Sequence, residues 1–283
     1  MNNPQDVVDD KFNSLKKILK GMNSVIVAYS GGVDSTFLLQ AAVDALGKDN
    51  VLAVITTGPS LPKDQYEQAV RLAQQIGATL QSVESDEMAD VKFTKNAADR
   101  CFHCKSHLFK ILLDIAKEKG FNAVIYGNNY DDKADYRPGS RAAAAFGIRA
   151  PLMDARLTKP DIRELSRRFG LPTADLPASP CLASRLPYGL DITAERLSQV
   201  EQAESFLREL GLAEFRVRHH GNLARIEVKP RQFAAVTSEP NKSKIIERLK
   251  AIGFTFVCID LQGFRSGALN EALAENEKLK AKN

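Results

Sequence analysis

The sequence lacks any long apolar run. No stretch approaches the ~20 consecutive apolar residues that a membrane-spanning helix needs. The N-terminus, MNNPQDVVDDKF, is polar and acidic and lacks the apolar centre of a secretory signal peptide. These two absences argue against a membrane-spanning or secreted protein, and we expect a cytoplasmic protein without a membrane partner.

A strong charge of one sign is missing as well. The 283 residues include 39 Lys and Arg and 35 Asp and Glu, which gives a net charge of +4. So small an excess argues against nucleic acid as a partner, because proteins that bind nucleic acid usually carry a concentrated basic surface. The sequence also contains no internal repeat and no low-complexity tract. Its length and ordinary composition predict one large domain and a smaller one.

Cysteine is scarce, with four residues in the chain. In a cytoplasmic protein, cysteines are more often metal ligands, catalysts or core residues than disulfide partners. Cys101 and Cys104 form a C-x-x-C pair, and Cys181 follows in a proline-rich segment. Cys258 lies in the apolar stretch TFVCID, where we expect it to be a buried core residue.

The most informative stretch is residues 24–46. β-Branched and apolar residues are followed by the turn Ser30-Gly31-Gly32-Val33-Asp34-Ser35 and then by apolar residues at helical spacing. This order predicts a buried strand, a tight turn and a helix. The N–H groups at the start of such a helix bind phosphate well, the two glycines let the backbone approach an anion, and the two serines add donors. The turn contains no lysine, which excludes the GxxxxGK[ST] nucleotide loop.

Strand and helix patterns alternate through residue 170. Strands are predicted at 51–57, 78–83, 123–126 and 148–152, and helices at 7–20, 63–76, 140–146, 158–170 and from 101 onwards. The alternation predicts an α/β fold in which a parallel sheet has helices on both faces. Ligands lie at the carboxyl ends of parallel strands, so Thr56 and Gly127, where two strands end, are candidate nucleotide-binding residues. Residues 84–100 are polar and acidic and are expected to form a loop over this site.

The pattern changes after residue 170. Residues 171–189 contain four prolines and predict an extended active-site loop or a linker. Beyond them, helices at 193–210 and 240–252 and strands at 214–219, 223–229 and 254–260 predict a small α+β domain. We therefore expect a first domain at 1–185 and a second at 186–283.

Two predicted strands of the second domain carry charges at every other position. If they pair through the turn at 219–222, then Arg216, Arg218, Arg225 and Glu227 share one face of the sheet. One interpretation is a solvated face with weak ion pairs. The other is a phosphate pocket, because arginine side chains bind phosphate oxygens in pairs.

The cysteine pattern allows several interpretations. A thioredoxin-type redox pair would not account for Cys181, and zinc would need a fourth ligand such as His103 or His107. Three thiolates leave one iron of a [4Fe–4S] cluster open for an extra sulfide. A C-x-x-C pair without any metal is the remaining alternative. Near Cys181, Arg185 would lower the thiol pKa, and a thiolate that faces an ATP-activated carbon is a nucleophile.

Four motifs together resemble the LarE family of PP-loop ATP pyrophosphatases, whose fold is of the adenine nucleotide α-hydrolase type. They are SGGVDS, the C-x-x-C-K segment at 101–105, GNNYDDKADYRPG at 127–139 and ASPCLASRLPYG at 178–189. The resemblance implies an ATP-dependent sulfur transferase that helps to make the nickel-pincer nucleotide cofactor of lactate racemase. Its substrate would be pyridinium-3,5-biscarboxylic acid mononucleotide, whose carboxylates are adenylated and then converted to thiocarboxylates.

The resemblance also implies roles for individual residues. ATP would be bound by Ser30, Gly31, Gly32, Asp34, Ser35, Thr56 and Gly127, and Asp34 would hold Mg²⁺. The substrate phosphate would be bound by Arg216 and Arg218, with Glu227 and Arg185 nearby. A homo-oligomer is expected, because a neighbouring subunit completes the substrate site in such families.

The family has two versions, which differ in the source of sulfur. In one, a single cysteine at the position of Cys181 gives up its own sulfur and ends as dehydroalanine. In the other, three cysteines hold a [4Fe–4S] cluster that passes on a bound sulfide. Because this sequence has Cys101, Cys104 and Cys181, we expect the cluster version, with a sulfur donor that the sequence does not reveal. Alternatives are the sacrificial version, a tRNA thiolase, an NAD or GMP synthetase and a nucleotide sensor.

Overall fold

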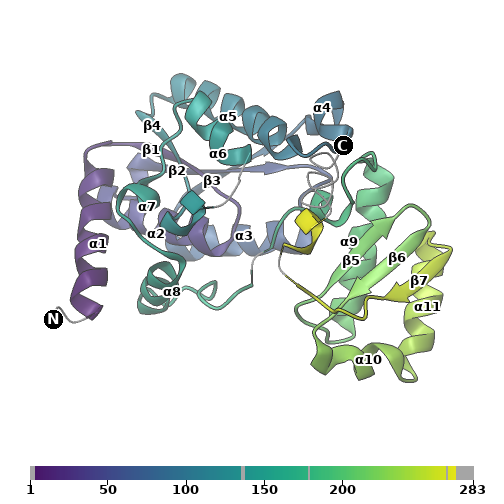
Figure 1. Cartoon of the computed structure of the whole chain (residues 1–283). Helices are drawn as coiled ribbons and strands as arrows, with labels where there is room; N and C mark the ends of the chain where they lie inside the picture. Colours follow the sequence, from purple (N-terminus) through teal and green to yellow (C-terminus); the bar gives the residue numbers. More distant parts are fainter. Residues whose placement is uncertain (1–3, 135–137, 178, 266, 272–283) are drawn as a thin grey trace, which may run out of the picture. The chain divides into compact units, whose positions relative to one another are not determined.

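The computed structural model describes residues 4–134, 138–177, 179–265 and 267–271. The chain forms two compact units, one of Met1–Glu87 and Cys101–Ser179 and one of Met88–Arg100 and Pro180–Asn283 (Figure 1). The chain therefore passes between the units at 87/88, 100/101 and 179/180.

The first unit contains a parallel four-stranded sheet, as predicted. Its strands are β1 (Val25–Ala28), β2 (Val51–Thr57), β3 (Thr79–Glu84) and β4 (Ala123–Tyr126), in the order β3-β2-β1-β4. Successive residues of β1 face opposite sides: Val25 and Val27 pack in one core cluster, and Ile26 and Ala28 in the other. Both faces of the sheet are therefore buried, which explains the continuous apolar runs of its central strands.

Helices cover both faces of this sheet (Figure 1). One face packs against α1 (Pro4–Lys20), α2 (Val33–Leu46), α3 (Lys63–Ile76), α7 (Pro151–Asp154) and α8 (Lys159–Arg168). The other face packs against α5 (Arg100–Lys119) and α6 (Pro138–Ala145). The 3-10 helices η1 (Lys48–Asn50) and η3 (Tyr130–Ala134) also belong to this unit, and η2 (Glu87–Ala89) lies where the chain passes to the second unit.

The predicted fifth strand at 148–152 is wrong. Only Arg149 pairs with the sheet: its N–H donates to Val124 at 3.0 Å, and its carbonyl accepts from Tyr126 at 3.1 Å. Pro151 then begins α7. Because proline has no N–H to continue the ladder and its fixed φ suits the first turn of a helix, pairing stops after one residue.

The segment expected to be a loop, 84–100, contains η2 and α4 (Val91–Thr94), and most of it belongs to the second unit. Asn96, which is fully buried, donates from its side-chain amide to the carbonyls of Pro187 and Leu190 at 2.8 Å each. Two backbone hydrogen bonds join the same segments, from Gly189 to Asn96 and from Ile192 to Thr94. Residues 88–100 are therefore a structural part of the unit that contains the proline-rich segment.

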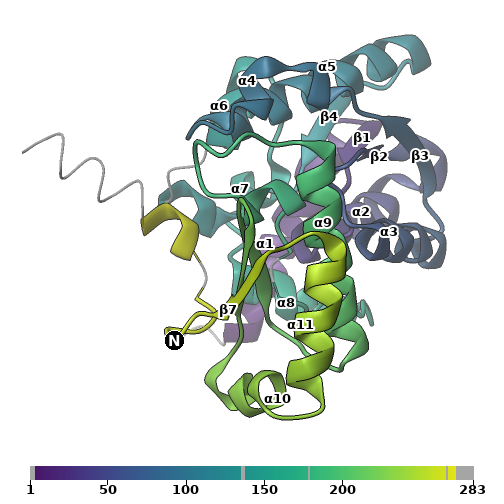
Figure 2. The same ribbon diagram turned by 90° about the vertical axis from the view of Figure 1, so that its right-hand side faces the viewer.

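The described part of the second unit contains a three-stranded sheet, two longer helices and several short ones. Its elements are η4 (Leu182–Arg185), α9 (Ala194–Glu209), β5 (Arg216–His220), β6 (Leu223–Glu227), η5 (Pro230–Gln232), α10 (Phe233–Thr237), α11 (Asn241–Ile252), β7 (Phe256–Ile259) and η6 (Ala268–Asn270). Strands β5 and β6 are antiparallel, whereas β6 and β7 are parallel. Helices α9 and α11 lie side by side on one face (Figure 2), where Leu207 and Leu249 join the core. This is the predicted α+β arrangement.

The prediction that Cys258 is a buried core residue is wrong, because its side chain is exposed. Strand β7 lies at the edge of its sheet, and its side chains alternate between two faces. Val257 and Ile259 pack against the core, whereas Phe256, 56% exposed, and Cys258 point to the other face. An apolar run on an edge strand therefore does not imply burial of both faces.

Within the described ranges, every helix is too short or too polar to cross a membrane.

Candidate functional site

The glycine turn lies where the strand order of the first sheet reverses. Strand β1 has β2 on one side and β4 on the other, so the chain leaves β1 and β4 at neighbouring carboxyl ends. Crevices at such positions bind ligands in open α/β sheets. The turn after β1 and Gly127 after β4 therefore lie next to each other at the edge of the sheet where such folds bind ligands.

The turn leads directly into α2, with Gly32 as its N-cap residue and no side chain capping the helix. Gly31 has φ +71°, and a Cβ atom there would lie 2.7 Å from the Cβ atom of Ala69 on α3, so only glycine fits without a shift. The hydroxyls of Ser30 and Ser35 are hydrogen-bonded to each other at 3.0 Å. Both predicted serine donors thus point into one small loop, at the positive end of the helix dipole.

Asp34 lies in the first turn of α2, and its carboxylate has two different environments. Oδ2 accepts a hydrogen bond from the ammonium group of Lys159, the first residue of α8. Oδ1 is buried and has no hydrogen-bond partner in the described part of the chain. A carboxylate oxygen without a partner fits Mg²⁺, which prefers oxygen ligands. The sequence alone did not point to Lys159, because 125 residues separate it from Asp34.

Gly127 brings the end of β4 against this loop. A Cβ atom at Gly127 would lie 2.8 Å from the backbone nitrogen of Ser35, so the backbone at Gly127 lies directly against the backbone at Ser35. The next residues are fixed by local hydrogen bonds, from Asn129 N–H to Asp132 at 3.0 Å and from Asp131 N–H to Asn129 at 2.9 Å. Thr56, the other predicted nucleotide residue, lies half-buried near the end of β2.

The C-x-x-C pair lies in the first turn of α5, in the first unit. Cys101 is exposed, and the half-buried thiol of Cys104 donates to Glu87 Oε2 at 3.3 Å. The other carboxylate oxygen of Glu87 accepts from the hydroxyl of Ser60. Glu87 is 5% exposed, although the sequence placed it in a polar loop, so no sequence signal identified it as a partner of Cys104.

Among the residues that the structure describes, no three His, Cys, Asp or Glu side chains are grouped to hold a metal ion. Cys101 and Cys104 belong to the first unit and Cys181 to the second. All four cysteines of the chain are thiols outside disulfides.

Cys181 lies in the second unit at the start of η4, with its side chain exposed. Arg185 holds this turn: its guanidinium group donates to the carbonyl of Cys181 at 3.1 Å and to the hydroxyl of Ser184 at 3.0 Å. Arg218 donates to the carbonyl of Ser184 at 2.8 Å. Two arginines from different elements therefore fix the backbone that carries the thiol.

The charged face predicted for the small sheet is present. Arg216 pairs with Glu227 and Arg218 with Arg225 across β5 and β6, so the four side chains share one face. Glu227, 1% exposed, accepts two hydrogen bonds from Arg218 and one from Arg225, at 2.9 to 3.1 Å. The pair of Arg218 with Glu227 is therefore a buried ion pair rather than one of the weak surface pairs of the first interpretation, while Arg225 is partly exposed.

Arg216 has a different environment from the other arginines. Its guanidinium group lies over the ring of Phe264, 5.1 Å from the centroid. Burial, and then repulsion from Arg185, lowers the pKa of Arg216 to about 10. A bound anion would offset both effects, so Arg216 is the arginine of this face whose charge an anionic ligand would stabilise most directly.

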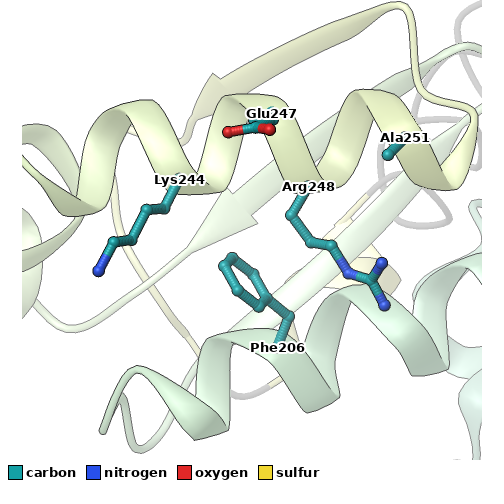
Figure 3. Close-up of a pocket in the computed structure, with 5 residues that line it drawn as sticks. All are labelled: Phe206, Lys244, Glu247, Arg248 and Ala251. Atoms are coloured by element: carbon teal, nitrogen blue, oxygen red, sulfur yellow. The ribbon is translucent and has the colours of Figure 1, made fainter.

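A hollow of about 300 Å³ lies between α9 and α11 of the second unit. It is lined by Phe206, Lys244, Glu247, Arg248 and Ala251. Figure 3 shows the ring of Phe206 between the side chains of Lys244 and Arg248. None of the predicted site residues lines it, so it is separate from the candidate site.

Comparisons with known proteins agree with this geometry. A model of the NAD synthase family matches residues 7–127, which contain the glycine turn and all four strands of the first sheet. The chain is 37% identical over 265 residues to the pyridinium-3,5-bisthiocarboxylic acid mononucleotide synthase of Lactiplantibacillus plantarum, covering 93% of this chain and 94% of that one. It is 40% identical to an uncharacterised protein of Synechocystis, covering 95% and 100%. A third relative, an uncharacterised protein of Methanocaldococcus jannaschii, is 32% identical, covering 90% and 95%.

Proposed function

This chain belongs to the LarE family, the family of the pyridinium-3,5-bisthiocarboxylic acid mononucleotide synthases, and from this premise we propose that it transfers sulfur to a pyridinium dicarboxylate mononucleotide. It is an ATP-dependent enzyme that forms AMP and pyrophosphate. The observation that carries the proposal is the 37% identity across 94% of the synthase.

The first chemical step is activation of a substrate carboxylate. A carboxylate oxygen bonds to the α-phosphorus of ATP, the bond from that phosphorus to the β-phosphate oxygen breaks, and pyrophosphate leaves. Ser30, Gly31, Gly32 and Ser35 would bind the departing phosphates, because their N–H and hydroxyl groups meet at the start of α2. Thr56 and Gly127 would border the rest of the nucleotide. Mg²⁺ held by Asp34 would supply positive charge against the phosphate oxygens.

The second step exchanges oxygen for sulfur. A sulfur nucleophile bonds to the activated carbon, and AMP leaves with the electron pair of the carbon–oxygen bond. Cys101, Cys104 and Cys181 would hold a [4Fe–4S] cluster, which would supply the sulfur as a bound sulfide. In the sacrificial alternative the exposed thiol of Cys181 is the nucleophile. Loss of its Cα proton then breaks its Cβ–Sγ bond, which releases the thiocarboxylate and leaves dehydroalanine. Both versions require the backbone at Cys181 to be held in place, and Arg185 and Arg218 do this.

The substrate phosphate would bind at the charged face of the second unit. Arg216 is the principal candidate, because burial and neighbouring arginines lower its pKa and an anion would relieve this. Arg218, Glu227 and Arg185 would keep the surrounding arginine and carboxylate groups in position. We also propose that the enzyme is a homo-oligomer and is located in the cytoplasm, as expected from the sequence.

The test combines substrates and products in one anaerobic assay. Protein, Mg²⁺–ATP and the biscarboxylate mononucleotide should give AMP, pyrophosphate and a thiocarboxylate product detectable by mass spectrometry. A second assay replaces the mononucleotide by nicotinic acid adenine dinucleotide and ammonia. It tests for NAD synthase activity, because the NAD synthase family model covers the proposed ATP-binding residues. Amidation of that compound, with no thiocarboxylate from the mononucleotide, would overturn the proposal.

Iron and sulfide content distinguish the two sulfur sources. Anaerobically reconstituted protein should bind iron and sulfide, and Cys101→Ser should lose both together with repeated turnover. If the wild-type protein binds no iron and the Cys181 peptide loses the mass of one H₂S during the reaction, the sacrificial version is correct.

A further inference from the structure

Lys159 and Asp34 form an ion pair inside the proposed ATP site. The ammonium group of Lys159 binds Oδ2 of Asp34, and the side chains are 36% and 20% exposed. The other carboxylate oxygen of Asp34 has no hydrogen-bond partner in the described ranges. A lysine therefore neutralises the carboxylate that is proposed to hold Mg²⁺.

Hydrogen bonds fix the backbone at the start of α8, from which the Lys159 side chain reaches Asp34 on α2. The backbone N–H of Lys159 donates to Asp131 Oδ2 at 2.8 Å, which ties the helix to the segment after β4. Thr158 caps the helix, and Asp161 completes a capping box with it. The backbone of Lys159 is thus fixed from two sides, while its four-carbon side chain keeps the freedom to turn.

We propose that Lys159 is a temporary counter-ion of Asp34. Its ammonium group binds the Asp34 carboxylate until ATP arrives with Mg²⁺, and the carboxylate then binds the metal instead. An ammonium group and a divalent cation on one carboxylate repel each other, so the lysine weakens metal binding in the absence of nucleotide. The negative charge of ATP removes this penalty because it attracts both cations. The metal would then enter the site together with the nucleotide, and binding of either would strengthen binding of the other.

The inference rests on the ATP-binding half of the proposed function and not on sulfur transfer. Its test therefore uses only nucleotide and metal. The probe is Mn²⁺, which is titrated into the protein without nucleotide. Electron paramagnetic resonance measures the concentration of free Mn²⁺. Lys159→Met should raise the affinity for Mn²⁺ about tenfold or more, because a positive charge next to the ligand is removed. The same variant should bind α,β-methylene-ATP more weakly in the presence of Mn²⁺.

Lys11→Met is the matched control. Lys11 pairs with Asp161 of the same helix at 2.6 Å, is also partly exposed, and lies outside the ATP site. It should leave the Mn²⁺ affinity unchanged. Lys159→Arg keeps the charge and should bind Mn²⁺ as weakly as the wild-type protein.

Equal Mn²⁺ affinity in the wild-type protein and Lys159→Met would overturn the proposal, and so would an equal gain in Lys11→Met. If Lys159→Met does not fold, as judged by circular dichroism, Lys159→Gln replaces it with the same expectation. Failure to make a thiocarboxylate would overturn the proposed function and leave these titrations unaffected, so the two failures are distinguishable.

Discussion

The guanidinium group of Arg185 binds both carboxylate oxygens of Glu204 at 2.9 Å, and each of the two side chains is only 3% exposed. Glu204 also accepts the backbone N–H of Val217 at 3.0 Å, which joins α9 to β5. Because the same guanidinium group donates to the carbonyl of Cys181, the turn that carries the thiol depends on a buried ion pair.

Replacement of Arg185 by Met should therefore destabilise the second unit. Glu204 would keep a buried charge without its counter-ion, and the expected loss is about 3–5 kcal/mol of unfolding free energy. Urea denaturation measures this loss. The double variant Arg185→Met/Glu204→Leu should recover part of the stability, because the unpaired charge is gone while the backbone N–H of Val217 loses its acceptor. It should not recover sulfur transfer, because the hold on the Cys181 carbonyl is still missing; recovery of both would contradict the positioning role.

Local patterns predicted much of this fold. The predicted strands at 51–57 and 123–126 and the helix at 63–76 match the observed bounds, because each is a continuous apolar run or an amphipathic period with clear ends. The predicted helix at 158–170 begins at Thr158, which is the N-cap residue of α8. The glycine turn could be proposed as a phosphate site from the sequence because the residues that carry this prediction are six neighbours, Ser30 to Ser35.

The missed features depend on contacts between distant residues. Lys159 reaches Asp34 across 125 residues, and Glu87 reaches Cys104 across 17, with no periodic pattern to connect them. Asn96 binds the carbonyl of Pro187 over a separation of 91 residues, so residues 88–100 could not be assigned to the second unit from their own composition. Such pairings are fixed by tertiary packing and leave no local signal.

Asp34→Asn should abolish the formation of AMP while leaving the fold intact. The amide lacks the negative charge that we propose binds Mg²⁺, and the rate should fall about 100-fold or more because charge stabilisation in the transition state is lost. Release of AMP and pyrophosphate from ATP and the mononucleotide is the measurement, with circular dichroism to verify folding. Unchanged AMP formation would remove Asp34 from the mechanism.

Gly127→Ala should weaken ATP binding and destabilise the first unit. The added methyl group would lie 2.8 Å from the backbone nitrogen of Ser35, so β4 and the glycine turn would have to move apart. We expect a loss of about 1–3 kcal/mol of unfolding free energy, as for other overpacked sites. Gly21→Ala is the control, because a Cβ atom there would lie no closer than 3.5 Å to its neighbours. Similar nucleotide affinity in both variants would show that this close approach does not shape the site.

Glu87→Ala should destabilise the segment around Cys104. The substitution removes the acceptor of two hydrogen bonds, from the hydroxyl of Ser60 and the thiol of Cys104, in a buried position. The free energy of unfolding should fall by about 1–3 kcal/mol in Glu87→Ala. It should fall less in Glu87→Gln, because an acceptor oxygen remains. Alkylation of Cys104, followed by peptide mass spectrometry, should become faster in Glu87→Ala. Glu84→Ala, an exposed glutamate on β3, should change neither property.

His219 should make the protein less stable as the pH falls. Its Nε2–H donates to Gln199 at 2.9 Å, and its ring packs edge-on against Phe254 inside the second unit.

Burial, and then repulsion from Arg196, lowers the pKa of His219 to about 4, whereas the unfolded chain has the ordinary value near 6.5. Between these two values the unfolded state binds a proton that the folded state does not. The contribution of this residue to stability is therefore constant above about pH 6.5 and falls by about 3 kcal/mol toward pH 4. His219→Gln should remove that part of the decline in urea titrations at pH 7.5 and 4.5, while the lowered pKa of His220 contributes equally to both proteins. An identical decline in variant and wild type would show that His219 is protonated in the folded protein.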